Sequence, residues 1–371
     1  MASIFEATTV NGMTLANRLV RSATWEGMCD PDGRPTARLA DCYRDLARGS
    51  VGLIISGYTF VRPDGKQLPG KMGLHTGGFI GDLGRVVEAV HGEGGRLCIQ
   101  LVHAGGQTRA QMAGSQPIAP SAVKVDQFPE TPRAMGEDDI RQVVAAFGAA
   151  AGRAKEAGAD AVQIHAAHGY LACQFLSPLT NRRTDAYGGS IDHRARFLLE
   201  VLAAIRQSVG PGFPVLVKLN GADFLPGGLE LADAVAVAGL LDQAGIDAIE
   251  VSGGTPASGM MIPVRTDILE PGQEAYHLDL ARAVKERVRC PVMVVGGFRS
   301  YDVVARAIER EGIDYVSLAR PFIREPDLAR RWQSGDHAPA RCISCNGCFG
   351  PGLKEGGIAC IQERQQGQKK G

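Results

Sequence analysis

Two imidazoles and a phenol stand within six residues of one another in the run Gln163-Ile164-His165-Ala166-Ala167-His168-Gly169-Tyr170. Imidazole N–H groups can polarise a carbonyl oxygen, and a phenol can supply a proton to a nearby carbon. His165, His168 and Tyr170 are therefore candidate catalytic residues of an enzyme that acts on an unsaturated carbonyl compound. A single buried histidine is more often an ordinary core residue, so the prediction depends on the three residues occurring together.

The catalytic run lies at the end of one of eight short apolar segments that alternate with helical patterns. Segments that are apolar on both faces are typical of parallel strands covered by helices, and their alternation with helices favours an α/β fold. The predicted strands span residues 19–22, 51–56, 97–102, 161–165, 215–219, 248–252, 292–295 and 315–319. The predicted helices between them span residues 140–157, 194–208, 231–244, 278–287 and 301–311.

Eight such units predict a closed (β/α)8 TIM barrel rather than an open sheet, because no G-x-G-x-x-G turn follows the first strand. A barrel carries its active site at the C-terminal ends of the strands, which is where His165 falls. Long loops at residues 68–77 and 107–135 are expected to form the walls of that site. The composition changes after Gly335, so we predict a barrel over residues 1–335 and a short cysteine-rich C-terminal extension over residues 336–371.

Charge and hydropathy restrict the partners of the protein. Forty basic and forty acidic residues give a net charge of zero over 371 residues, which argues against binding to nucleic acid. No apolar run reaches the roughly 18 residues that span a bilayer, and the N-terminus lacks the pattern of a secretory signal. We expect a cytoplasmic protein with no membrane partner; the oligomeric state, a homo-oligomer included, stays open.

Four of the nine cysteines gather near the C-terminus, with the spacing Cys342-x2-Cys345-x2-Cys348-x11-Cys360. Because no secretory signal is present, metal ligation explains this set better than disulfide bonding. Four thiolates with this spacing suit either a tetrahedral zinc ion or a [4Fe–4S] cluster. Between the two, we favour the iron–sulfur cluster.

Longer motifs extend from the catalytic run and recur at other strand ends. The long ones are His165-Ala166-Ala167-His168-Gly169-Tyr170-Leu171, Gln174-Phe175-Leu176-Ser177-Pro178 and Asn181-Arg182-Arg183-Thr184-Asp185-Ala186-Tyr187-Gly188-Gly189-Ser190. The short ones are Asn17-Arg18, Gln100-Leu101-Val102-His103-Ala104-Gly105, Gly296-Gly297 and Ala319-Arg320-Pro321. Together they resemble the Old Yellow Enzyme family of NADH:flavin oxidoreductases, and the resemblance covers nearly all of residues 4–335.

The resemblance implies an FMN-dependent ene-reductase with a barrel that holds FMN non-covalently at its C-terminal face. NADH or NADPH would reduce the flavin, and the substrate would be a small activated alkene such as an enone, an enal or a nitroalkene. By position, His165 and His168 would bind the carbonyl or nitro oxygen, and Tyr170 would protonate the α carbon. Hydride would pass from the reduced flavin to the β carbon.

The resemblance also assigns residues to FMN. Gln100 would hydrogen-bond the pyrimidine edge of the flavin, and Lys218 would stand beside flavin N1, where a cation stabilises the anionic reduced form. The residues that follow the last two strands would hold the phosphate, as in many barrel enzymes. These phosphate-binding residues are Gly296, Gly297, Ala319 and Arg320.

The first strand departs from the usual family pattern at Ala23-Thr24-Trp25. Relatives contact the flavin carbonyl from this segment with a threonine or a cysteine. Our alignment places Trp25 at that position, and a shift of one residue would assign the contact to Thr24. Both assignments stay open.

The cysteine spacing resembles that of larger relatives, the dienoyl-CoA reductases and trimethylamine dehydrogenases, in which a [4Fe–4S] cluster and then further nucleotide-binding domains follow the barrel. Since the sequence stops at Gly371, a cluster here would exchange electrons with a separate partner protein. The cysteine motif suggests two alternatives to an ene-reductase. One is an amine-type dehydrogenase, although the sequence gives no clear aromatic cage for an amine, and the other is a flavin/iron–sulfur electron-transfer subunit.

Overall fold

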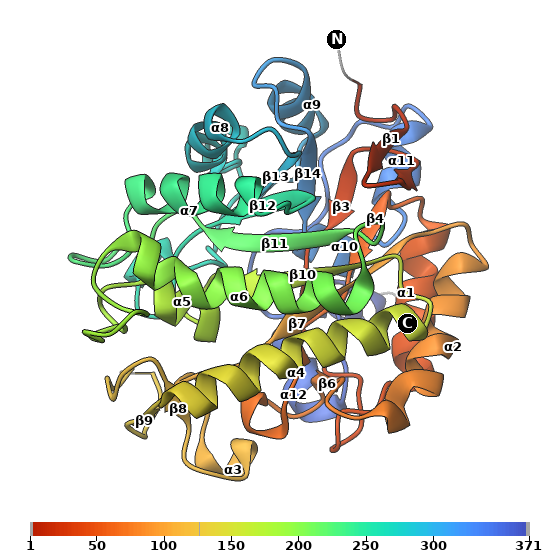
Figure 1. Ribbon diagram of the computed structural model, residues 1–371. Helices are drawn as coiled ribbons and strands as arrows, with labels where there is room; N and C mark the ends of the chain where they lie inside the picture. The colour runs from red at the N-terminus through yellow and green to blue at the C-terminus, as the bar shows by residue number, and fades with distance from the viewer. Residues whose placement is uncertain (1–2, 126, 369–371) are drawn as a thin grey trace.

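A closed barrel of eight parallel strands forms the centre of the computed structural model, which describes residues 3–125 and 127–368 (Figure 1). Each strand pairs with the next, and the last pairs with the first, so that the ring is closed. The barrel strands are β3 (Leu19–Arg21), β4 (Leu53–Ile55), β7 (Leu97–Val102), β10 (Ala161–Ala166), β11 (Val215–Asn220), β12 (Ala248–Ser252), β13 (Val292–Val295) and β14 (Tyr315–Leu318). The predicted (β/α)8 barrel is confirmed.

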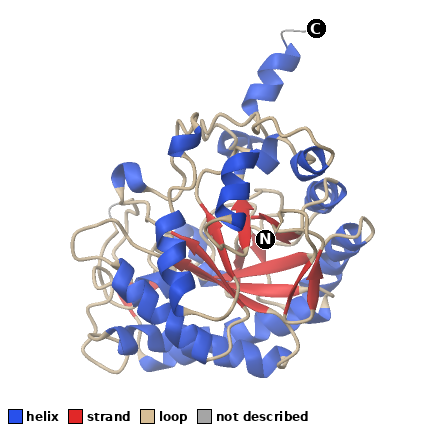
Figure 2. Ribbon diagram, turned by 90° about the horizontal axis from the view of Figure 1, so that it is seen from above, coloured by secondary structure: helices blue, strands red, loops and turns tan. Residues whose placement is uncertain are grey.

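Helices lie outside the strands, as the view from above shows (Figure 2). Their ends follow local rules: the helix over residues 191–209 begins after Ser190, whose hydroxyl accepts a hydrogen bond from the His193 amide, and ends at Gly210. The surrounding helices are α1 (Ala37–Arg48), α2 (Ile80–His91), α4 (Glu137–Glu156), α6 (Ile191–Val209), α7 (Leu231–Gln243), α8 (Leu278–Arg287) and α9 (Tyr301–Glu309), and after the last strand α10 (Arg320–Arg324) and α11 (Leu328–Gln333).

Short elements close the two ends of the barrel. The antiparallel hairpin of β1 (Thr8–Val10) and β2 (Met13–Leu15) packs against the apolar residues at the N-terminal end of the barrel strands. At the opposite end, β5 (Thr59–Phe60) pairs with the last residues of β7. The other rim elements are η1 (Pro63–Gly65), β6 (Met72–Gly73), η2 (Gly77–Phe79), α3 (Ala110–Ala113), β8 (Ile118–Ala119), β9 (Arg133–Ala134), α5 (Leu171–Leu176), η3 (Gly259–Met261) and η4 (Pro271–Gln273).

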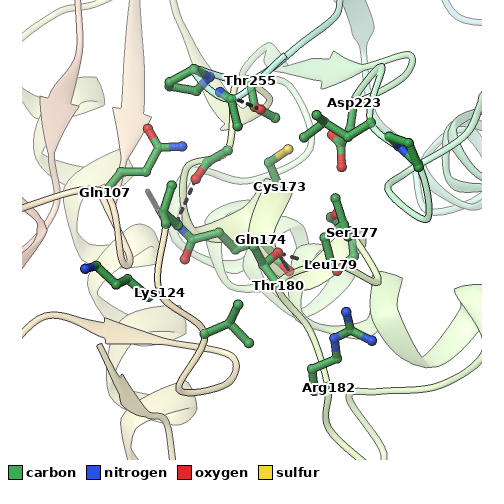
Figure 3. Close-up of a pocket in the computed structure, with 17 residues that line it drawn as sticks. Gln107, Lys124, Cys173, Gln174, Ser177, Leu179, Thr180, Arg182, Asp223 and Thr255 are labelled. Atoms are coloured by element: carbon green, nitrogen blue, oxygen red, sulfur yellow. Dashed lines mark hydrogen bonds between the residues drawn. The ribbon is translucent and has the colours of Figure 1, made fainter. Parts of the chain in front are cut away.

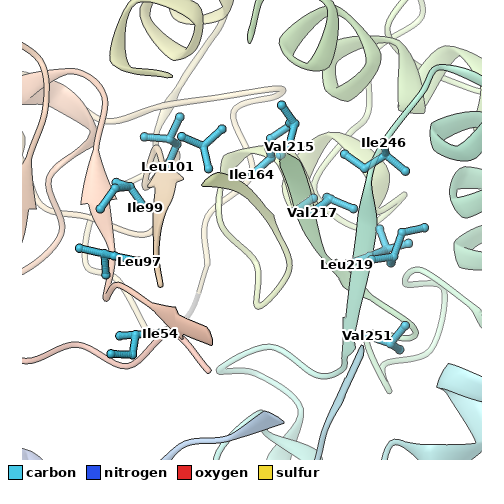
Figure 4. Packing of buried hydrophobic residues seen from close by; sticks show 14 of the residues in the cluster. Ile54, Leu97, Ile99, Leu101, Ile164, Val215, Val217, Leu219, Ile246 and Val251 are labelled. Atoms are coloured by element: carbon cyan, nitrogen blue, oxygen red, sulfur yellow. The ribbon is translucent and has the colours of Figure 1, made fainter. Parts of the chain in front are cut away.

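Side chains alternate along each strand and so create two separate cores. One set packs between the strands and the helices, and part of it is drawn in Figure 4: Ile54, Leu97, Ile99, Leu101, Ile164, Val215, Val217, Leu219 and Val251. The other set fills the N-terminal half of the barrel interior: Val20, Leu53, Ile55, Cys98, Ala161, Leu216, Ala248, Met293 and Tyr315. The next residues of this second set along the strands are polar, namely Gln100, Gln163, Lys218 and Glu250. The C-terminal half of the barrel interior is therefore polar, and this is where a functional site can form.

The C-terminal extension carries α12 (Phe349–Glu355) and α13 (Ile361–Gln368). Two hydrogen bonds to its backbone join it to the barrel: the Ile358 amide donates to the Glu26 carbonyl at 2.8 Å, and the side-chain Nε of Arg299 donates to the Cys342 carbonyl at 2.6 Å. The division of the chain at residue 335 stays a prediction. Among the described helices, none has the length and apolarity that crossing a membrane requires.

Candidate active site

The structure brings His165, His168 and Tyr170 together at the C-terminal end of β10. The ring centroids of His165 and His168 are 5.1 Å apart, and those of His165 and Tyr170 are 4.9 Å apart. The backbone turns through left-handed conformations at His168 (φ 60°) and Gly169 (φ 76°), which are costly for a residue with a Cβ and are concentrated at functional sites. A Cβ at Gly169 would lie 2.0 Å from Gln107 Nε2, so this turn requires glycine.

His165 presents one nitrogen as a hydrogen-bond donor. Its Nδ1 accepts a hydrogen bond from the Ala167 amide at 3.3 Å, so the proton of the neutral ring resides on Nε2. Burial, reinforced by the positive charges of Lys218 and Lys71, holds the pKa of His165 well below its usual value. The ring is therefore neutral at physiological pH and can donate a hydrogen bond without giving up its proton.

His168 is held by the next two strands of the barrel. Its Nε2 lies 2.7 Å from Ser252 Oγ, and its amide donates to Asn220 Oδ1 at 3.3 Å. Burial, then the neighbouring His165 and Lys218, keep the pKa of His168 well below its usual value. When Nε2 accepts a hydrogen bond from the Ser252 hydroxyl, Nδ1 carries the ring proton and becomes a donor, as Nε2 of His165 is.

Tyr170 is a protonated phenol at neutral pH. Burial raises its pKa above the usual value, and the hydrogen bond of its hydroxyl to Gln67 Oε1, at 2.8 Å, offsets only part of this rise. Its ring also meets the ring of Tyr58 edge to face, with centroids 5.1 Å apart. The sequence did not single out Gln67, Tyr58 or Ser252, since all three belong to other strands and loops of the rim.

A buried polar network lies beneath these three side chains. Gln100 Nε2 donates to Gln163 Oε1 at 2.8 Å, and Gln163 Nε2 donates to Glu250 Oε2 at 2.9 Å. Lys218 Nζ lies 3.1 Å from Glu250 Oε1 and donates to Ser22 Oγ at 2.7 Å. The Ser22 hydroxyl in turn donates to Glu250 at 2.6 Å. Each charged or polar group is thus paired, which buried charges require.

Glu250 is the carboxylate that balances Lys218. Its burial would raise its pKa, but Lys218, Ser22 and Gln163 together hold the pKa below the usual value. Sequence reasoning found Gln100 and Lys218 but missed Ser22, Gln163 and Glu250. A signal was available, because Gln163 and Glu250 are polar residues inside otherwise apolar strands, and Glu250 stands opposite Lys218 in the register of β11 and β12.

A narrow cavity adjoins this network between the ends of β3, β11, β12, β13 and β14. Lys218 and Arg320 both line it, and the Ser317 hydroxyl on its wall is buried without a hydrogen-bond partner in the described structure. Gly297 (φ 73°) lets the backbone approach, because a Cβ there would lie 2.7 Å from the Tyr276 ring. The predicted residues that line this cavity are Ala23, His168, Lys218, Gly297, Ala319 and Arg320. Two cations, a free hydroxyl and a close backbone approach fit a ligand with an anionic phosphate.

Thr24 and Trp25 lie beside this cavity rather than on its wall. The Thr24 hydroxyl donates to the Ser22 carbonyl at 3.0 Å. The Trp25 ring packs toward the C-terminal extension, and a Cβ at Gly352 would lie 3.0 Å from it. Gly296 is likewise not part of the cavity wall, and a Cβ there would lie 3.0 Å from the His277 amide nitrogen.

A larger cavity of about 470 Å³, shown in Figure 3, is lined in part by Gly169 of the catalytic turn. Gly169 and Gln107 form part of its wall, and Gln107 Nε2 donates to the His168 carbonyl at 2.9 Å. Its other labelled residues come from the predicted wall loop, from α5 and the loop that follows it, and from the loops after β11 and β12: Lys124, Cys173, Gln174, Ser177, Leu179, Thr180, Arg182, Asp223 and Thr255.

The four C-terminal cysteines line one small cavity together with Arg320 and Arg324. The loop turns through left-handed conformations at Ser344 (φ 55°) and Asn346 (φ 56°), and the Ser344 amide lies 3.5 Å from Cys342 Sγ. Within residues 3–125 and 127–368, however, no three cysteine, histidine or acidic side chains converge closely enough to hold a metal ion. Arg320 connects this loop to the first cavity, because its guanidinium donates to Asn346 Oδ1 at 2.5 Å. The cysteines predicted as ligands, Cys342, Cys345, Cys348 and Cys360, are thus neighbours but do not form a converged site.

Comparison with known proteins agrees with this description. Residues 3–338 match the NADH:flavin oxidoreductase / NADH oxidase family. The chain is 36% identical to a metal reductase of Desulforamulus reducens, over 100% of this chain and 54% of that protein. It is 38% identical to an NADPH dehydrogenase of Halalkalibacterium halodurans, over 87% of this chain and 91% of that protein. A solved complex of 2-naphthoyl-CoA reductase with 2-naphthoyl-CoA superposes with a TM-score of 0.88 at 27% identity, over 96% of this chain and 56% of that one.

The barrel and its rim therefore place the chain among the (β/α)8-barrel flavin oxidoreductases. The chain belongs to the NADH:flavin oxidoreductase / NADH oxidase family, the family of Old Yellow Enzyme, and the predicted resemblance is confirmed. It spans about half the length of the metal reductase and of an NADH oxidase of Thermoanaerobacter brockii that it also matches.

Proposed function

We propose that this protein is an ene-reductase, in which NADH or NADPH reduces bound FMN and the β carbon of an activated alkene receives the hydride. The proposal is carried by one observation, the clustering of two neutral imidazoles and a protonated phenol at the mouth of the barrel. Bound FMN would supply the hydride chemistry. The substrate would be a small enone, enal or nitroalkene.

His165 and His168 would hold the carbonyl or nitro oxygen of the substrate. Two N–H donors that converge on one oxygen withdraw charge from the conjugated alkene, and donors held in fixed positions do so without reorganising. Because both rings are neutral, they bind the oxygen without transferring a proton to it. Tyr170, the third member of the cluster, would then give its proton to the α carbon.

The cavity beside Lys218 would hold FMN. Lys218, fixed by Glu250 and Ser22, would stand at the flavin ring, since its ammonium is already held rigidly by these partners. The phosphate would lie at the other end of the cavity, at Gly297, Ala319 and Arg320. The remaining contacts with the flavin would come from Gln100, Ala23 and Thr24; we assign the flavin carbonyl to Thr24, because the Trp25 ring packs against the extension.

Rates of flavin reoxidation by an enone test the proposed function. Tyr170→Phe and the double variant His165→Ala/His168→Ala should bind FMN but reduce the enone about 100-fold more slowly, since general acid catalysis typically contributes this much. Tyr187→Phe is a matched control, because its phenol is bonded to Glu200 on the outer surface of the barrel. If the Tyr170 and histidine variants load FMN and reduce the alkene as fast as the parent, the protein is not an ene-reductase of this kind.

We also propose that Cys342, Cys345, Cys348 and Cys360 hold a [4Fe–4S] cluster that exchanges electrons with a partner protein. The four thiols share one cavity beside two arginines, and these cations would offset the charge of the thiolates. Iron and acid-labile sulfide in anaerobically purified protein should be lost in Cys345→Ala and kept in the control Cys290→Ala, whose thiol lies far from this loop in the sequence. If the purified protein contains stoichiometric zinc and no iron, the four cysteines form a zinc site and the proposed cluster is wrong.

A further inference from the structure

Lys71 is a buried cation beside the candidate proton donor. Only 3% of its surface is exposed, and its ammonium nitrogen lies 3.6 Å from the centroid of the Tyr58 ring and 5.8 Å from that of Tyr170. Among the described residues, none accepts a hydrogen bond from this ammonium or forms an ion pair with it. Lysine is rarely buried without an anionic partner, and the proposed function gives Lys71 no role.

The nearest carboxylate does not serve as that partner. Glu26 is already engaged by Arg21, at 2.7 Å, by the hydroxyl of Tyr43, also at 2.7 Å, and by the Gly57 amide at 3.1 Å. Its charge is therefore balanced by Arg21, and Lys71 is left as an additional positive charge that faces an aromatic pair. Burial lowers the pKa of Lys71 to about 7, with Glu26 offsetting part of the change. A large fraction of Lys71 is thus charged at neutral pH.

Tyr58 connects this cation to the catalytic phenol. Lys71 sits over the ring of Tyr58, where the negative face of the aromatic system attracts it. The Tyr58 hydroxyl donates to the Gly65 carbonyl, which fixes the ring, and the ring meets Tyr170 edge to face. The position of the ammonium relative to Tyr170 is therefore set by packing rather than by a flexible side chain.

We propose that Lys71 is the counter-charge of Tyr170 during proton transfer. When the O–H bond of Tyr170 breaks and the substrate α carbon takes the proton, the oxygen keeps the electron pair of that bond as a phenolate. The β carbon receives its hydride from the flavin that NADH or NADPH has reduced, so no further reductant is needed. The ammonium of Lys71 stabilises the phenolate until the oxygen is reprotonated from solvent. The inference rests on the proposed function of Tyr170. Lys71 would act through Tyr170, by stabilising its negative charge, and would not contact the substrate.

Separate measurement of the two half-reactions tests this role. In Lys71→Met, reoxidation of the reduced protein by an enone should slow on the order of tenfold, because a charge pair at this separation is lost in a poorly screened site. Reduction by NADH or NADPH should keep the parental rate. Lys66→Met is the matched control: Lys66 stands in the same loop, is half-buried and donates to the Pro31 carbonyl. If Lys71→Met disturbs the fold, Lys71→Gln repeats the test. This second variant should have the same FMN content and melting temperature as the parent.

A pH profile separates charge from packing. The parental rate of alkene reduction should fall as Lys71 loses its proton above about pH 7, whereas Lys71→Arg should keep a high rate there, since arginine stays charged. Three titratable groups facing Lys71 keep their protonation state in this range: His165 stays neutral because its pKa is lowered, and Tyr58 and Tyr170 stay protonated because their pKa values are raised. The remaining charged group on this side, Glu26, forms an ion pair with Arg21.

Three outcomes would overturn the proposal. Lys71→Met with the parental rate in both half-reactions shows that the charge is dispensable. A higher KM for carboxylate-bearing enones at unchanged kcat shows that Lys71 binds the substrate instead. If the parent itself reduces no activated alkene, the proposed function fails and the role of Lys71 falls with it; a failure confined to Lys71 leaves the Tyr170→Phe defect intact, so the two failures are distinguishable.

Discussion

The barrel mouth and the cysteine loop of residues 342–360 both gather reactive side chains, but the mouth holds its side chains in a network of hydrogen bonds and an ion pair. At the mouth, Ser252 bonds His168, Gln67 bonds Tyr170 and Glu250 pairs with Lys218. In the cysteine loop the thiols share a cavity, yet no metal-binding trio converges in the part of the chain that the structure describes. Rigid strands preorganise a site, whereas a loop of thiols is organised by the ligand it binds.

The largest expected effect comes from breaking the preorganised network at Glu250. Glu250→Ala leaves the Lys218 ammonium buried without its carboxylate, and removing one partner of a buried pair costs about 3–5 kcal/mol. The free energy of unfolding from urea titrations should fall by this amount. Glu93→Ala is the control, because Glu93 pairs with Arg48 at the surface, and such pairs contribute little. Equal losses in the two variants would mean that the network is not a special source of stability.

Acid should destabilise the mouth of the barrel through His277. Burial lowers the pKa of this histidine to about 3 from its usual value of 6.5. Between these two values the unfolded chain binds a proton that the folded protein does not, so stability falls as the pH falls through this window. His277→Asn should reduce the slope of unfolding free energy against pH by about 1.4 kcal/mol per unit.

Exposed His193 supplies the control for this slope. His193→Asn should leave the dependence of stability on pH as it is in the parent, because this side chain is exposed to solvent in the folded protein. Parallel curves for His277→Asn and the parent would show that His277 takes up a proton in the folded protein well above its lowered pKa.

A smaller effect is expected when one positioning contact of a catalytic ring is removed. Ser252→Ala deletes the 2.7 Å contact to His168, and a neutral hydrogen bond is worth about 1 kcal/mol, which corresponds to about a fivefold change in rate. Alkene reduction should slow by this factor while FMN binding is unchanged. Ser258→Ala, on the neighbouring loop, controls for the loss of a buried hydroxyl. A loss as large as that of the double histidine variant would assign Ser252 itself to catalysis.

The sequence predicted the features that depend on residues near one another in the chain, and it missed the contacts between residues that are far apart in the chain. The eight strands and the run from His165 to Tyr170 carry local patterns, and Lys218 and Arg320 stand at strand ends that the barrel repeat identifies. The partners of the catalytic groups are far away in sequence: Ser252 is 84 residues from His168, Gln67 is 103 residues from Tyr170, and Glu250 is 228 residues from Ser22. Closure of the barrel brings these pairs together, and no local pattern encodes which loop residue meets which strand end.

The smallest change in global stability, and the sharpest contrast between the two regions, should come from loading the cysteine loop with iron and sulfide. Trypsin should cleave after the exposed Arg341 and Lys354 several-fold more slowly in anaerobically reconstituted protein than in chelator-treated protein, because ligation draws the loop together. Cleavage after Arg85, exposed on α2, should keep its rate, since the barrel is already organised. If the loop is equally resistant before and after reconstitution, its order comes from protein contacts alone, and the cysteine loop is then preorganised in the same way as the barrel mouth.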